Sequence, residues 1–244
     1  MTNPESNSGL YDRVYEIGNL YSAWVRVEES DGCAGIDGVT LERFAENPDA
    51  ELARLGRELA EESYRPLPAA QFFVPKRGGG RRRLCVLAVR DRVAQHAAIN
   101  VIRSRIEAEF EDVSYAYRRG RSVKQALDQV ERLRDAGYQW VVDADISSYF
   151  ENVDPGLLLG RVRELIEDER IVGLIEQWIA AFVYDGKEMT TISRGGRSSL
   201  NSSSGSTPSS NIRARASTPR GGGALTFRWG ITRSCCEARR RRND

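Results

Sequence analysis

The sequence has little of the residue types from which nucleophilic and metal-binding sites are usually built. It contains one histidine, His96, and four cysteines, and no cysteine spacing is typical of a metal site or a disulfide framework. His96 lies within a predicted helix, where a packed or surface role is the default. Neither a Ser/His/Asp or Cys/His arrangement nor a Walker loop is present. These absences argue against enzymes that use such nucleophile arrangements and against enzymes that bind nucleotides through a Walker loop.

Long apolar runs are also missing. No stretch of about 18 apolar residues occurs, so we expect no membrane span and no membrane partner. The N-terminus, MTNPESNSGL, lacks the basic and then apolar order of a secretory signal. With no disulfide framework either, we expect a reducing, cytoplasmic location.

The net charge of +1 conceals two unlike parts. Residues 190–244 hold 11 arginines and 2 acidic residues, a charge of +9, whereas residues 1–189 hold 25 basic and 33 acidic residues, a charge of −8. The basic part is also rich in serine and glycine and shows no sustained apolar period. We therefore predict a folded part over 1–189 and a disordered tail over 190–244.

Apolar spacing in the first part predicts an α/β chain. A hairpin is expected between residues 72 and 87, and a strand over 139–146. Ser122 and Gln125 form a capping-box pattern at the start of one helix, and Asp154 followed by Pro155 starts another. The remaining helices are expected at 11–29, 40–63 with an interruption at Pro48, 90–110 and 171–183.

Two carboxylates share one face of the predicted strand. Side chains alternate along a strand, so Asp143 and Asp145 point to the same side. Acids at a strand end suit a divalent cation such as Mg²⁺, which prefers oxygen ligands and bridges to phosphates. A solvated strand edge followed by a turn explains the same pattern, and the pattern alone favours that simpler interpretation.

The predicted hairpin is strongly basic. Between Val74 and Arg92 only one residue, Asp91, is acidic, and seven are basic: Lys76, Arg77, Arg81, Arg82, Arg83, Arg90 and Arg92. Guanidinium and ammonium groups beside glycine-exposed amides suit phosphate groups. A solvated hairpin tip is the simpler alternative. In a part of the chain that is otherwise acidic, this density favours a polyanionic ligand.

A third feature mixes aromatic and basic residues. The segment SYAYRRGRS, residues 114–122, places two tyrosines and three arginines directly before a helix. Rings that stack on bases, interleaved with guanidinium groups, are typical of nucleic-acid binding, and a helix N-terminus favours phosphate. Packing of Tyr115 and Tyr117 on the core, with solvated arginines, is an equally good interpretation.

Taken in order, four segments resemble the reverse transcriptase domain of the type encoded by bacterial group II introns. They are AGIDGVT at 34–40, YRPLPAAQFFVPKRGGGRRRLCVLAVRDRVAQHA at 64–97, SYAYRRGRSVKQAL at 114–127 and VVDADISSYFENVD at 141–154. In the third segment Ala116 replaces the usual glycine. The resemblance implies an α/β fold with the fingers and a partial palm of a right-hand polymerase, followed by a disordered tail.

The resemblance also implies residue roles. Asp145 corresponds to the palm aspartate that binds the metal ions, Mg²⁺ in this family, with help from the carbonyl of Ile146, and Asp143 is a supporting acid. Lys76 and Arg82 correspond to residues that grip the nucleotide triphosphate, and Phe150 to the aromatic residue that excludes a 2′-hydroxyl. The residues expected to contact nucleic acid are Arg77, Arg81, Arg83, Arg92, Tyr117, Arg118, Arg119 and Arg121. The implied partners are an RNA template, a DNA primer and deoxynucleoside triphosphates, with intron RNA as a further candidate.

The sequence departs from the family after about residue 190. It contains no Gly-x-x-Gln-Gly and no Tyr-x-Asp-Asp motif, and the latter supplies a further metal-binding carboxylate. One aspartate does not hold two cations, so we expect little or no polymerase activity. The composition after residue 190 suggests a frameshifted reading, a hypothesis that requires a Tyr-x-Asp-Asp motif in another frame of the DNA downstream.

Two alternatives to a polymerase fragment remain at this level. A non-catalytic RNA-binding module would use the hairpin and the Tyr/Arg loop without chemistry. A protein-interaction domain would have no nucleic-acid role at all.

Overall fold

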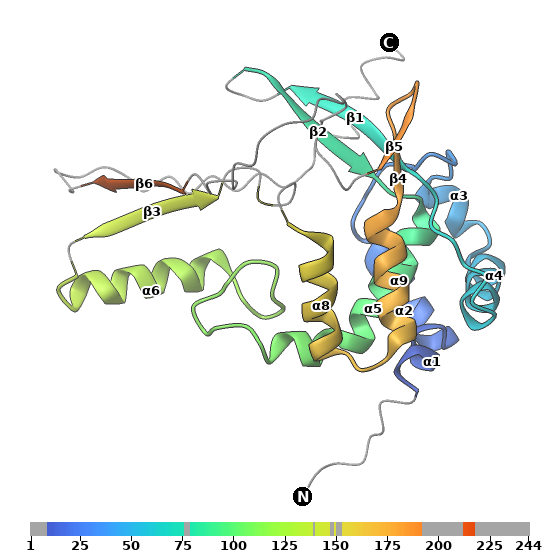
Figure 1. The fold of residues 1–244 in the computed structure, drawn as a ribbon, viewed down its shortest axis with the longest axis horizontal. Helices are drawn as coiled ribbons and strands as arrows, with labels where there is room; N and C mark the ends of the chain where they lie inside the picture. Colours follow the sequence, from blue (N-terminus) through green and yellow to red (C-terminus); the bar gives the residue numbers. More distant parts are fainter. Residues whose placement is uncertain are drawn as a thin grey trace, which may run out of the picture. The chain divides into compact units, whose positions relative to one another are not determined.

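The computed structural model describes residues 9–75, 79–138, 140–146, 149, 153–191 and 212–217. The chain divides into two compact units. The first comprises residues 1–105, 154–195 and 231–244, and the second residues 106–153 and 196–230. Helices and strands occur in both units (Figure 1), which confirms the α/β class.

The first unit contains most of the helices. They are α1 (Leu10–Val14), α2 (Ile17–Glu28), α3 (Leu41–Ala45), α4 (Pro48–Ala60), α5 (Val89–Glu107), α8 (Pro155–Leu165) and α9 (Glu169–Ala180). The interruption expected at Pro48 separates α3 from α4. Asn47 caps α4 by accepting a hydrogen bond from the Ala50 N–H at 3.3 Å, and Pro48 occupies the first turn, where its missing N–H costs nothing. In the described part of the chain, no helix is long and apolar enough to cross a membrane.

The core of this unit is aliphatic and aromatic. Leu20 and Trp24 of α2 are buried against the other helices, and Trp24 stacks on Phe44 of α3 with ring centroids 4.5 Å apart. Asp168 caps α9 and also accepts a hydrogen bond from the Tyr11 N–H at 3.0 Å. This hydrogen bond joins α1 to the start of α9, although the two helices lie far apart in the sequence.

A four-stranded sheet in the order β2-β1-β4-β5 lies in the same unit. Its strands are β1 (Ala69–Pro75), β2 (Arg81–Val86), β4 (Phe182–Tyr184) and β5 (Met189–Thr191). The helix predicted to reach Val183 is three residues too long, because α9 ends at Ala180 and the chain turns directly into β4 (Figure 1). There Val183 pairs with Ala69 of β1 in parallel, and ladder hydrogen bonds replace another helical turn.

The second unit contains α6 (Val123–Asp135) and a two-stranded antiparallel sheet of β3 (Val141–Ile146) and β6 (Ile212–Ser217). The capping box of α6 forms as predicted, with Ser122 and Gln125 bonded to each other's backbone N–H groups. β6 lies within the part of the chain, residues 190–244, for which the sequence predicts a disordered tail. Its sequence, IRARAS, alternates apolar or small residues with arginine, a short period of two that suits an edge strand.

A buried carboxylate connects three elements of the first unit. Asp91, in the first turn of α5, has no exposed surface. Its Oδ1 accepts a hydrogen bond from the Tyr64 hydroxyl at 2.7 Å, and its Oδ2 accepts one from the Leu67 backbone N–H at 2.9 Å. The Trp178 indole of α9 donates to the same Tyr64 hydroxyl at 3.1 Å. Asp91 therefore fixes the segment that leads into β1 against both α5 and α9.

Replacing Asp91 with alanine should lower the free energy of unfolding by about 2–4 kcal/mol, because the Tyr64 hydroxyl and the Leu67 N–H lose their buried acceptor. Asp91→Asn, which keeps one acceptor oxygen, should cost less. Urea unfolding followed by tryptophan fluorescence measures both changes. Equal stability of Asp91→Ala and the native chain would contradict this role.

The same variants have a pH signature. Burial raises the pKa of Asp91 above its ordinary value, against the opposing hydrogen bonds from Tyr64 and Leu67. The stability of the native chain relative to Asp91→Asn should therefore be greatest below the unfolded pKa of about 4, and it should fall as the pH rises through the folded value. A difference that grows with pH would be inconsistent with a raised pKa.

Candidate nucleic-acid interface

The basic hairpin forms where the sequence predicts it, with longer strands than expected. β1 and β2 pair antiparallel, so that Val74 lies opposite Arg82 and Phe73 opposite Arg83. Cross-strand partners share a face and neighbours along a strand alternate, so Arg82 lies on one face of the hairpin, and Arg81 and Arg83 on the other. All three arginines are exposed. The hairpin therefore offers positive charge on both faces.

Two exposed aromatic residues accompany these arginines. Phe72 and Phe73 of β1 are 42% and 56% exposed. In the sequence they belong to the apolar run of a predicted strand; their position beside a basic turn is the signal that identifies them as candidate stacking residues. Lys76 and Arg77 lie outside the described residues.

The basic residues that follow the hairpin are held by the protein itself. Arg90 donates to both carboxylate oxygens of Glu58, and its guanidinium carbon lies 5.3 Å from the centroid of the Tyr64 ring. Arg92 is half-buried, and its Nη2 donates to the Cys33 carbonyl at 2.8 Å. Among the described members of the basic stretch, the exposed ones are therefore the three arginines of β2.

Arg118, predicted to contact nucleic acid, instead supports its own loop. Its side chain is 6% exposed, and its Nη2 lies 2.7 Å from a carboxylate oxygen of Glu107. Its Nη1 donates to the carbonyls of Glu111 and Ser114, and its guanidinium lies over the Phe110 ring. These contacts occupy the guanidinium, so Arg118 positions the loop on which the neighbouring residues sit.

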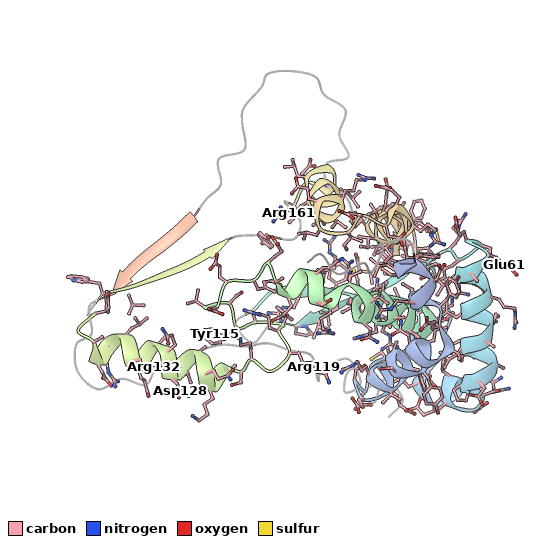
Figure 2. The ribbon with its side chains drawn as sticks, turned by 90° about the horizontal axis from the view of Figure 1, so that it is seen from below. Glu61, Tyr115, Arg119, Asp128, Arg132 and Arg161 are labelled. Atoms are coloured by element: carbon pink, nitrogen blue, oxygen red, sulfur yellow. The ribbon has the colours of Figure 1, made fainter. Side chains whose placement is uncertain are left out.

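The other predicted residues of this loop differ in exposure. Tyr117 is 84% exposed and has a left-handed φ of 58°, and Arg119 is exposed. Arg121 is half-buried, with its Nη2 3.4 Å from Asp112 and its guanidinium over the Tyr115 ring. Figure 2 shows Tyr115 and Arg119 on the loop that precedes α6. Tyr117 and Arg119 are thus the residues of this loop best placed to meet a ligand.

A cavity of about 440 Å³ lies between this loop and the start of α6. Apolar and aromatic side chains make up much of its lining, including Tyr115, Ala126 and Leu127. At the helix start, the Ser122 hydroxyl already accepts the Gln125 N–H at 3.2 Å. The cavity wall therefore suits a flat apolar group, such as a base, better than a phosphate.

The first palm motif lies on β3. Asp145 and Ile146 are the last two residues of the strand, as the sequence predicts. In the pairing with β6, Asp143 lies opposite Arg215 and Asp145 lies opposite Arg213. β6, the strand that pairs with β3, therefore has an arginine opposite each of the two aspartates.

The residues of this sheet do not match a complete two-metal centre. Two cations about 4 Å apart require carboxylates from more than one segment. β6 has no carboxylate, and among the described residues no group of three His, Cys, Asp or Glu is placed to hold a metal ion. Phe150 lies outside the described residues.

Comparison with known proteins agrees with these features. Residues 74–206, more than half of the chain, match the family model "Reverse transcriptase (RNA-dependent DNA polymerase)". This chain belongs to the reverse transcriptase family. The match includes β2, α5, α6 and β3, the elements that carry most of the candidate site residues.

The relatives place the chain with the group II intron type. "Protein YkfC" of Escherichia coli is 37% identical over 151 residues, which are 60% of this chain and 40% of that protein. "Group II intron-encoded protein LtrA" of Lactococcus lactis is 28% identical over 175 residues, which are 70% of this chain and 28% of that protein. The resemblance stated from the sequence is thereby confirmed: the chain is a reverse transcriptase domain of the group II intron type. It spans less than half the length of these relatives.

Among solved structures, a chain of a "Partial Cas6-RT-Cas1--Cas2 complex" aligns with a TM-score of 0.47 at 22% identity. The alignment covers 74% of this chain and 29% of that one.

Proposed function

We propose that this chain binds an RNA template through its fingers hairpin and does not by itself complete nucleotidyl transfer. The observation that carries the proposal is that one hairpin presents three exposed arginines on β2 and two exposed phenylalanines on β1. Guanidinium groups bind phosphates and aromatic rings stack on bases, so this combination suits a single strand. In the family's full reaction the DNA primer and a deoxynucleoside triphosphate would join the template, with Lys76, Arg82 and Phe150 at the nucleotide.

The division of the chain supports the same proposal. Residues 1–189 supply the fingers and part of the palm, and residues 190–244 are proposed to be read out of frame. Mg²⁺, the cation that the family generally uses, needs more carboxylates than the single strand β3 provides. Binding and catalysis are thus separable in this chain: the binding residues are present, and the catalytic set is incomplete.

Reversing the charge of the hairpin should weaken RNA binding. The triple variant Arg81→Glu, Arg82→Glu and Arg83→Glu should lower the affinity for a short oligouridylate by about 100-fold, because each arginine neutralises a phosphate. The slope of log affinity against log salt concentration should flatten by about 2. Fluorescence anisotropy over a salt series measures both quantities.

A matched control carries the same change in net charge elsewhere. Arg43, Arg54 and Arg161 each pair with a glutamate on their own helix or at its end. Their reversal to glutamate should change the affinity by less than about threefold. If the two triple variants bind RNA equally, the hairpin is not the binding site, and a protein-interaction role gains support.

Primer extension tests the second half of the proposal. With an RNA template, a DNA primer, deoxynucleotides and Mg²⁺, the native chain should extend no more primer than Asp145→Ala, because one aspartate does not supply the ligands for two cations. Gel analysis of the extended primer is sufficient. Extension by the native chain that disappears in Asp145→Ala would show that the catalytic set is complete after all.

A further inference from the structure

Two helices of the first unit carry a basic cluster that the hairpin does not include. It consists of Arg26 on α2 and Arg92, His96 and Arg103 on α5. Among these four residues, the sequence predicts a nucleic-acid contact for Arg92 and a packed or surface role for His96. All four residues are half-buried.

The helix packing brings these residues together. The Asn19 side chain of α2 donates to the Ala97 carbonyl of α5 at 3.0 Å, and Asn100 donates to the Asn19 side-chain oxygen at 3.0 Å. Arg92, near the start of α5, reaches the Cys33 carbonyl beyond the end of α2. The two helices therefore run antiparallel.

Helical spacing then aligns the basic side chains. Arg92, His96 and Arg103 are separated by four and seven residues, which places them on one stripe of α5, the stripe that also holds Asn100. Arg26 follows Asn19 by seven residues, two turns along the same face of α2. Since the helices are antiparallel, Arg26 lies beside the first half of α5.

The cluster has little neutralising charge of its own. Within the described ranges, no ion pair involves Arg26 or Arg103, whereas Arg43, Arg90 and Arg170 are paired with carboxylates. Burial and the positive charges of Arg26, Arg103 and Arg92 all lower the pKa of His96. Burial lowers the pKa of Arg92, and the opposing electrostatic effects come from Cys33 and Asp37.

Two nitrogen atoms of the cluster are buried and have no hydrogen-bond partner: Arg92 Nε and His96 Nδ1. Buried polar atoms are usually paired, and half-buried cations without carboxylates are costly. An anion that accepted hydrogen bonds from these groups would remove both costs. Phosphate, with several acceptor oxygens and a negative charge, has the required chemistry.

The geometry points to a second nucleic-acid contact in which the stripe formed by Arg26, Arg92, His96 and Arg103 binds successive backbone phosphates of the bound strand. The inference rests on the proposed function, because the phosphate belongs to the nucleic acid that the hairpin binds. This contact shares no residue with the hairpin. In it, His96 binds phosphate. RNA and DNA share this chemistry, so both are used in the test.

The chain's single histidine provides a specific probe. In tag-free full-length protein labelled at histidine, NMR titration of the ring signals gives the pKa of His96 with and without a short oligouridylate. Bound phosphate should raise that pKa by about one unit, because a negative charge replaces the surrounding excess of positive charge. An oligodeoxyuridylate arm shows whether the contact distinguishes RNA from DNA.

Substitutions in the cluster test whether the change in the His96 pKa comes from phosphate bound there. Arg26→Gln with Arg103→Gln should abolish the shift of His96 and lower RNA affinity about tenfold, while Arg43→Gln with Arg161→Gln should retain both. Gly32→Ala is a second route, because its new Cβ would lie 2.2 Å from Arg92 Nη1 and must displace that flexible guanidinium. It should reduce the shift without a change in the helices, even if the double variant fails to fold.

The outcomes separate this inference from the proposed function. RNA binding by anisotropy with an unchanged His96 signal would overturn the inference and leave the hairpin proposal intact. A shift produced by inorganic phosphate alone, and not by either oligonucleotide, would also overturn it. No RNA binding in any assay would overturn both.

Discussion

The fingers hairpin depends on the buried carboxylate of Asp91. A charge without solvent contact is costly unless hydrogen bonds and opposite charge compensate it. Here the Tyr64 hydroxyl and the Leu67 N–H donate to the carboxylate, and Arg90 Nε lies 3.7 Å away. The compensating groups come from the segment before β1 and from α5 itself. The direction in which the chain enters the hairpin is therefore fixed by polar contacts as well as by apolar packing.

These contacts also connect the hairpin to the far end of the unit. Trp178 of α9 donates to the Tyr64 hydroxyl, and α9 leads directly into β4, which pairs with β1. The sheet and the carboxylate thus join the same three segments. A change at Asp91 would be felt at Tyr64, at the start of β1 and at the end of α9, although none of these residues faces the proposed ligand.

The use of acidic residues makes the proposed binding of a polyanion compatible with the charge of −8 on residues 1–189. Several carboxylates are occupied inside the fold or beside its arginines: Glu58 binds Arg90, Asp12 binds Arg170, and Asp168 caps α9. In the cluster on α2 and α5, Arg26 and Arg103 take part in no ion pair within the described ranges. Net charge is therefore a poor guide to the ligand, and the distribution of charge over the surface is a better one.

Sequence patterns predicted those features that depend on local physics. The break at Pro48, the capping box at Ser122 and the strand that ends in Asp145 and Ile146 each follow from backbone geometry or side-chain period. The end of α9 was missed because Phe182 and Val183 continue the apolar pattern of the helix, and pairing with β1, a distant segment, decides the outcome. β6 was missed because six residues of alternation are a weak signal within a basic, serine-rich stretch.

The residues of the candidate site also show what local sequence patterns do not determine. Arg118 and Arg119 are adjacent and chemically identical, yet Arg118 is enclosed by Glu107, Phe110 and backbone carbonyls while Arg119 is exposed. Nothing in the sequence separates them, because the distinction arises from the path of the loop. His96 is the converse case. As a lone histidine it carried no signal, and only the packing of α2 against α5 gives it three arginines as neighbours.

The sheet of β3 and β6 shows why binding and catalysis need not remain together in such a chain. In the register of this sheet, Asp145 lies opposite Arg213 and Asp143 lies opposite Arg215. A centre for two cations requires carboxylates from more than one segment, and β6 contributes none. The hairpin and the helical cluster have no such requirement, since each carries its own basic residues. The proposed binding residues lie on β1, β2, α2 and α5, outside this sheet.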